Sequence, residues 1–133
     1  MTFYSKRPVQ TKEAPGNTGP YSQGLVVGPF VYVSGQGPLD PQTKAVVSGT
    51  IEEETMVTFK NIEAILLAAG SSLNDVVKVN VYLQDIGDFE RFSRTYATIF
   101  ERVKVLPVRT TVGAGLTGIK VECDVVALQS RQE

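Results

Sequence analysis

The spacing of apolar residues changes between residues 50 and 128, and this change restricts the folds that the chain can adopt. Between Thr50 and Gly70 apolar residues recur every three or four positions, which predicts an amphipathic helix. From Val76 to Leu83 the spacing becomes two, which predicts a half-buried strand. A chain with both patterns buries its apolar faces best by packing helices on a sheet.

The first predicted helix has signals at both ends. Thr50 followed by Glu53 fits a capping box, in which each side chain bonds the other residue's backbone N–H. Gly70 suits the position after the last turn, where a left-handed backbone is common. A second helix is predicted from about Asp88, with one apolar face made of Phe89, Phe92, Tyr96, Ile99 and Phe100.

The remaining apolar segments read as strands. The runs 24–27 and 30–34 flank Gly28-Pro29, which is a hairpin pattern. Further strands are predicted near Val108–Val112 and from Ile119 to Leu128. The order is therefore hairpin, helix, strand, helix, strand, strand. This order predicts a two-layer α+β fold, with a mixed β-sheet covered by two helices on one face.

Length and composition agree with one folded domain. The chain has 133 residues, of which 42% are hydrophobic and 20% are charged, so we expect a single domain over residues 1–133. The sheet face that points away from the helices mixes polar with apolar side chains, which predicts a self-association surface. Its members are Lys78, Asn80, Tyr82, Glu122, Val126 and Leu128.

Composition also excludes several kinds of chemistry. The chain has no histidine and one cysteine, which removes histidine-based triads, the usual zinc sites and an internal disulfide. Thirteen basic and fourteen acidic residues leave a net charge of −1, which argues against a nucleic-acid partner. No apolar run approaches the ~18–20 residues of a membrane span, and no secretory signal is visible, so we expect a cytoplasmic protein without a membrane partner.

Two motifs are interpreted as structural. The segment Gly113–Gly118 matches G-x-G-x-x-G, but a β-alternating stretch follows it where a dinucleotide site needs a helix. We therefore interpret it as a glycine-rich connection between strands. Cys123 lies on the apolar face of the last strand, which predicts a small buried hydrophobe rather than a nucleophile.

Arg109 and Glu122 are charged residues inside predicted strands. A charge among apolar neighbours is costly unless it is paired or used. One interpretation is structural: the two residues form a salt bridge, or they lie exposed at a sheet edge. The other is functional: the planar guanidinium of Arg109 holds a substrate carboxylate, and Glu122 positions a water molecule. The residue types alone leave both interpretations open.

Several blocks of the sequence together resemble a known family. The chain is similar to the Rid (reactive intermediate deaminase) family, also called the YjgF/YER057c/UK114 family, over nearly its whole length. The blocks are 19–24 (Gly-Pro-Tyr-Ser-Gln-Gly), 33–36 (Val-Ser-Gly-Gln), 75–89 (Asp-Val-Val-Lys through Asp-Ile-Gly-Asp-Phe) and 107–122 (Pro-Val-Arg through Val-Glu).

The resemblance implies a fold, an assembly and an activity. The fold is the chorismate-mutase-like α+β fold of the bacillus type, and the assembly is a homotrimer with one site in each cleft between subunits. The activity is that of a 2-iminobutanoate/2-iminopropanoate deaminase, which hydrolyses enamines and imines such as 2-aminoacrylate to 2-oxo acids and ammonia. The family uses neither a metal nor an organic cofactor, so none is expected here.

The resemblance also assigns roles to residues. The arginine that grips the substrate carboxylate corresponds to Arg109, and the glutamate that orients the attacking water corresponds to Glu122. The pocket tyrosine corresponds to Tyr21, and the backbone of a Ser-Gly pair corresponds to Ser34 and Gly35.

Two substrate-binding positions depart from the family pattern. Ser93 stands where deaminases of the family often have asparagine, and Thr111 stands where many have cysteine. One alternative is therefore a specialised deaminase of a larger substrate, of the 2-aminomuconate type. A second is a small-metabolite-binding or chaperone-like trimer without turnover. A third is a ribonuclease or translation inhibitor, against which the near-neutral charge argues.

Overall fold

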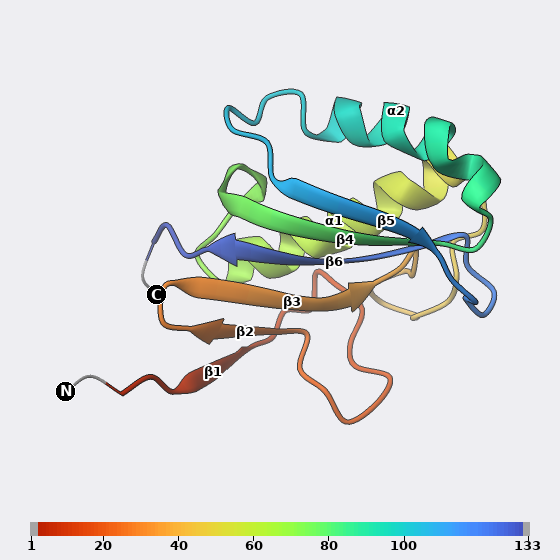
Figure 1. Ribbon diagram of the computed structural model, residues 1–133. Coiled ribbons are helices and arrows are strands. Elements are labelled where there is room, and N and C mark those ends of the chain that lie inside the picture. The colour runs from red at the N-terminus through yellow and green to blue at the C-terminus, as the bar shows by residue number, and fades with distance from the viewer. Residues whose placement is uncertain (1–2, 132–133) are drawn as a thin grey trace.

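The computed structural model describes residues 3–131 and shows one mixed sheet with two helices on one of its faces (Figure 1). The sheet order is β1-β2-β3-β6-β4-β5. The strands are β1 (Lys6–Val9), β2 (Gly24–Val27), β3 (Phe30–Gln36), β4 (Val76–Leu83), β5 (Val108–Gly113) and β6 (Val121–Leu128). The helices are α1 (Ile51–Ala68) and α2 (Phe89–Ile99), and short 3-10 turns cover Leu73–Asp75 and Ile86–Asp88.

The predicted two-layer α+β architecture is confirmed, and the chain order of the predicted elements is correct. The pattern missed β1, because its four residues do not alternate in polarity and include Pro8. Proline is tolerated in this position, since β1 is an edge strand that pairs with β2 alone.

The last strand of the chain lies in the middle of the sheet. β6 pairs antiparallel with β3 on one side and with β4 on the other. β5 pairs parallel with β4, and α2 makes the crossover between them, so α2 runs beside the β5 edge (Figure 1). The segment that carries Arg109 therefore lies at one edge of the sheet, close to α2.

The predicted helix signals are largely confirmed. Thr50 and Glu53 form the capping box, with N–H to side-chain oxygen distances of 2.8 and 3.1 Å. Gly70 follows α1 with a φ of 76°, a conformation that favours glycine. Asp88 does precede α2, but its side chain makes no capping bond. The carboxylate of Asp85 accepts instead from the Gly87 N–H at 2.8 Å and orders the turn before α2.

A buried carboxylate fixes the entry to β6. Glu54 of α1 is 1% exposed and accepts from the backbone N–H of Lys120 at 2.8 Å. It also forms an ion pair with the Lys120 ammonium at 3.2 Å and accepts from the Gly49 N–H at 3.3 Å. Each partner offsets the cost of burying the charge. The position of Glu122, two residues further on, is thereby tied to α1.

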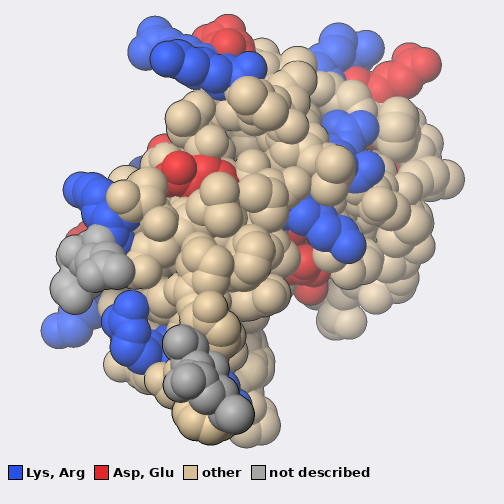
Figure 2. Space-filling model, turned by 60° about the vertical axis from the view of Figure 1, so that its left-hand side comes forward, with Lys and Arg blue, Asp and Glu red and all other residues tan. Residues whose placement is uncertain are grey.

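The surface of the described residues shows mixed charge. On the face in Figure 2, Lys and Arg side chains are dispersed and acidic side chains lie among them. Within residues 3–131, neither helix has the length and apolar character needed to cross a bilayer.

Candidate functional site

The strand register places Arg109 and Glu122 on opposite faces of the sheet. Arg109 lies opposite Val79, a buried residue that faces the helices. Glu122 lies opposite Tyr82, one position out of phase with Val79. Because residues paired across strands share a face, Arg109 faces the helix layer and Glu122 faces the open side of the sheet.

Arg109 lies under α2 among aromatic side chains. One Nη of its guanidinium donates to the Ser93 hydroxyl at 3.0 Å. Its Cζ lies 4.7 Å from the ring centre of Tyr96 and 5.5 Å from those of Phe89 and Phe92. We call these three rings the aromatic cage. The half-buried cation is therefore held by π faces and one hydroxyl.

No carboxylate pairs with Arg109 among residues 3–131. Arginine carries five N–H donors, and the bond to Ser93 uses one, which leaves four without a protein acceptor in the described part of the chain. Nearby on the same strand face, the Thr111 hydroxyl is buried and finds no hydrogen-bond partner within residues 3–131. This group of Arg109, Ser93 and Thr111 is suited to binding a planar anion.

Glu122 is half-buried on the open face of the sheet. Burial raises the pKa of its carboxyl group, and the negative charge of Asp124 raises this pKa further. Asp124 is held by the Asn80 amide, which donates to it at 2.9 Å. A carboxylate with a raised pKa is a better proton acceptor than an ordinary glutamate.

A bulge in β3 brings Gly35 against Glu122. The register of β3 on β6 shifts between Val33 and Gln36, and Gly35 lies within this irregular stretch. A Cβ atom at Gly35 would collide with the Glu122 carboxylate, so any side chain at position 35 would displace this carboxylate from its observed place.

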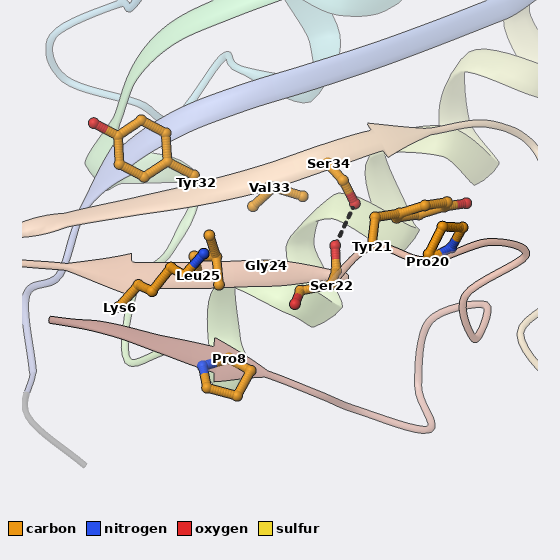
Figure 3. Close-up of a pocket in the computed structure, with 10 residues that line it drawn as sticks. All are labelled: Lys6, Pro8, Pro20, Tyr21, Ser22, Gly24, Leu25, Tyr32, Val33 and Ser34. Carbon is orange, nitrogen blue, oxygen red and sulfur yellow. Dashed lines mark hydrogen bonds between the residues drawn. The ribbon is translucent and has the colours of Figure 1, made fainter.

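Tyr21 and Ser34 line a hollow of about 560 Å³ on the open face (Figure 3). Its other walls come from β1, β2 and β3, and include Lys6, Leu25 and Tyr32. The Ser34 hydroxyl donates at 3.0 Å to the carbonyl of Ser22, next to Tyr21. The Ser34 side chain therefore supports the loop that carries Tyr21.

The predicted site residues thus form two groups within one chain. The helix-face group is Arg109, Ser93 and Thr111, and the open-face group is Tyr21, Ser34, Gly35 and Glu122. The structural interpretation of a salt bridge between Arg109 and Glu122 is wrong, because the sheet lies between the two side chains.

Other sequence interpretations have clear outcomes. Cys123 is fully buried, and burial raises the pKa of its thiol well above the ordinary value, as expected for an inert hydrophobe. The glycine-rich segment from Gly113 leads into β6 without a helix, so it is a connection between strands. Helical spacing did not predict the aromatic cage, because this spacing assigned the three rings to the apolar core. The signal that could have found it is one arginine in a strand packed under an aromatic helix face.

Comparisons with known proteins agree with this architecture. The chain matches the family model described as Endoribonuclease L-PSP over residues 11–129. A RutC family protein of Pyrococcus abyssi is 42% identical over 123 residues, which cover 92% of this chain and 97% of that protein. The human 2-iminobutanoate/2-iminopropanoate deaminase is 37% identical over 129 residues, with 97% and 94% covered. The crystal structure of Escherichia coli TdcF with bound serine has a TM-score of 0.87 at 32% identity, with 93% and 99% covered.

The fold and the two groups define a class of two-layer α+β domain. It presents on one sheet face a cation without an acidic partner in residues 3–131, and on the other face a carboxylate. The chain belongs to the Endoribonuclease L-PSP family, which is the Rid or YjgF/YER057c/UK114 family indicated by its sequence blocks. Members of this family include proteins named as imine deaminases.

Proposed function

We propose that this protein hydrolyses 2-imino acids and their enamine tautomers, such as 2-aminoacrylate, to 2-oxo acids and ammonia. The observation that carries the proposal is the state of Arg109: a half-buried guanidinium with no acidic partner in the described chain and four unused N–H donors. Such a cation binds a carboxylate through its planar fork. The name of the human relative and the serine bound to TdcF support a small carboxylate ligand.

In the proposed reaction the substrate carboxylate binds Arg109, and the enamine tautomerises to the imine. On the imine protonated at nitrogen, Glu122 accepts a proton from a water molecule as the water oxygen bonds to the imine carbon, and the C=N electron pair moves to nitrogen to give a neutral carbinolamine. Protonated Glu122 then returns this proton to the amino nitrogen. The C–N bond breaks as the hydroxyl oxygen forms the C=O bond, the O–H proton passes back to Glu122, and ammonia leaves. Placement of the reactants supplies most of the rate gain, because an imine carbon is already electrophilic.

The two groups can act on one substrate only if they come from different chains, because the sheet separates them within one chain. We therefore place the reaction between two subunits of a homotrimer, with the helix-face group from one and the open-face group from its neighbour. The β5 edge of the sheet supports this assembly, since this strand and the segment just before it expose apolar side chains: Val105, Leu106, Val108 and Val112.

The substrate side chain is assigned to the hollow beside Tyr21 and Ser34. Its volume of about 560 Å³ is larger than the ethyl group of 2-iminobutanoate requires. This observation favours a second candidate, a deaminase that accepts larger imines. A panel of imines with small, branched and extended side chains separates the two candidates.

The test compares Arg109→Lys with Arg94→Lys, a matched change at an exposed residue of α2. Lysine keeps the charge but loses the planar pair of donors, so we expect Arg109→Lys to lower the rate of ammonia release on the order of 100-fold. Arg94→Lys should release ammonia like the wild type, and all three proteins should share one melting temperature and one sedimentation profile. An Arg109→Lys protein with normal folding and near wild-type turnover would refute the proposed function.

A further inference from the structure

We propose that the aromatic cage holds the guanidinium of Arg109 ready for a carboxylate, and that Tyr96 is the positioning residue within it. This inference rests on the proposed function, because it explains how Arg109 stays both ordered and free to bind. It assigns a role to side chains that otherwise look like ordinary members of the apolar core.

Tyr96 makes the closest of the three ring contacts, at 4.7 Å from ring centre to Cζ. Its ring is fixed on its other sides by core aromatics. It stacks on Phe100 with ring centres 4.5 Å apart and an angle of 27°, and it meets Phe59 of α1 at 5.8 Å and 78°. Tyr96 is 8% exposed. A ring held in this way gives the guanidinium a rigid surface.

The cage orders the cation without neutralising it. An acidic partner would occupy the donor fork and compete with a ligand carboxylate, whereas an aromatic face leaves the N–H groups at the guanidinium rim free. Ordering a long side chain before binding also removes part of the entropy cost of binding. The phenol itself stays neutral: burial, partly opposed by the positive charge of Arg109, raises the pKa of Tyr96 to about 12. The Tyr96 hydroxyl is buried and has no hydrogen-bond partner in the part of the chain that the structure describes, so the ring is the part that acts on Arg109.

The experiment measures the affinity for 2-oxobutanoate, a stable carboxylate, by isothermal titration calorimetry on the full chain. Tyr96→Leu removes the ring and should weaken binding roughly 2- to 30-fold, the range expected for one lost cation–π contact. Tyr96→Phe restores the ring and should recover most of the affinity. Phe100→Leu is the control for losing a buried ring from this cluster, because Phe100 is also buried but its ring does not lie over Arg109. The leucine still fills most of the space beside Tyr96, so affinity should fall less than in Tyr96→Leu.

Two further measurements keep the test decisive. Nitrogen-15 relaxation of the Arg109 Nε–H should show a more mobile guanidinium in Tyr96→Leu than in Phe100→Leu. If Tyr96→Leu does not fold, Phe89→Leu tests the same cage, because Phe89 is exposed on α2 and also lies over the guanidinium. Phe89→Leu should then weaken binding by about 2-fold or more.

Equal affinities for Tyr96→Leu and Phe100→Leu, or a wild type that does not bind 2-oxobutanoate, would overturn the inference. Its failure is distinguishable from that of the proposed function. A wild type that releases ammonia, with turnover equally affected by both leucine variants, rejects the cage and keeps the deaminase. A wild type that releases no ammonia, with 2-oxobutanoate binding that follows the predicted order, rejects the deaminase and keeps the cage.

Discussion

Two inactive variants should regain activity when their chains are mixed. Arg109→Lys damages the helix-face group and leaves the open-face group intact, whereas Glu122→Gln does the reverse. Within one chain these groups lie on opposite faces of the sheet. A mixed assembly can therefore contain sites in which an intact Arg109 from one chain meets an intact Glu122 from another.

The size of the recovery follows from the geometry. In a random equal mixture, half of the helix-face groups and half of the open-face groups are intact, so about one quarter of the sites between subunits contain both. If each variant alone is on the order of 100-fold slower than the wild type, the mixture should exceed this background by roughly 25-fold. The fraction is the same for any closed ring of subunits.

The assay unfolds the two variants together in urea, refolds them, and measures ammonia release from freshly generated 2-aminoacrylate. A chain with both substitutions, mixed equally with wild type, is the control: sites between subunits leave about one quarter of the activity, whereas sites within one chain leave about one half. A mixture of the single variants that is no faster than the variants refolded separately would refute the placement of the site between chains.

Three further substitutions follow from the described contacts. Cys123→Ser should lower the free energy of unfolding by about 1–3 kcal/mol, because a hydroxyl replaces a thiol in the core, and should leave ammonia release per folded protein unchanged. Urea unfolding and turnover assays check this, and complete loss of activity in a folded protein would show that the thiol takes part in the reaction. Ser93→Asn keeps a hydrogen-bond acceptor for Arg109 but occupies more space, so the ratio of deamination rates on small and large imines should shift. Unchanged ratios across a panel of imines would show that residue 93 does not face the substrate side chain. Asp124→Asn removes a charge that raises the Glu122 pKa, so this pKa should fall. Because the reaction needs ionised Glu122, the acid limb of the kcat–pH profile should move to lower pH, and a limb that stays or moves to higher pH contradicts the assignment of Glu122 as the base.

Local signals in the sequence correctly predicted most of the elements. The α1 boundaries follow from the capping box at Thr50 and the glycine at position 70, both of which act through bonds within a few residues. The alternation in β4 and β6 is long enough to show which side chains face the core. β1 escaped prediction because its four residues are mostly exposed and gain their order from β2.

The candidate site likewise has one part that the sequence indicates and one part that depends on tertiary packing. The sequence by itself determined which residues are candidates for it, because charged and hydroxyl side chains inside strands stand out and the motif blocks match a family. Only the tertiary structure decided that Arg109 and Glu122 lie on opposite sheet faces. β5 is short and half-exposed, so its own pattern does not show which way Arg109 points, and its pairing with β4 settles the direction. The aromatic cage likewise depends on the packing of α2 against β5, a contact between two elements that the periodicity within either element does not encode.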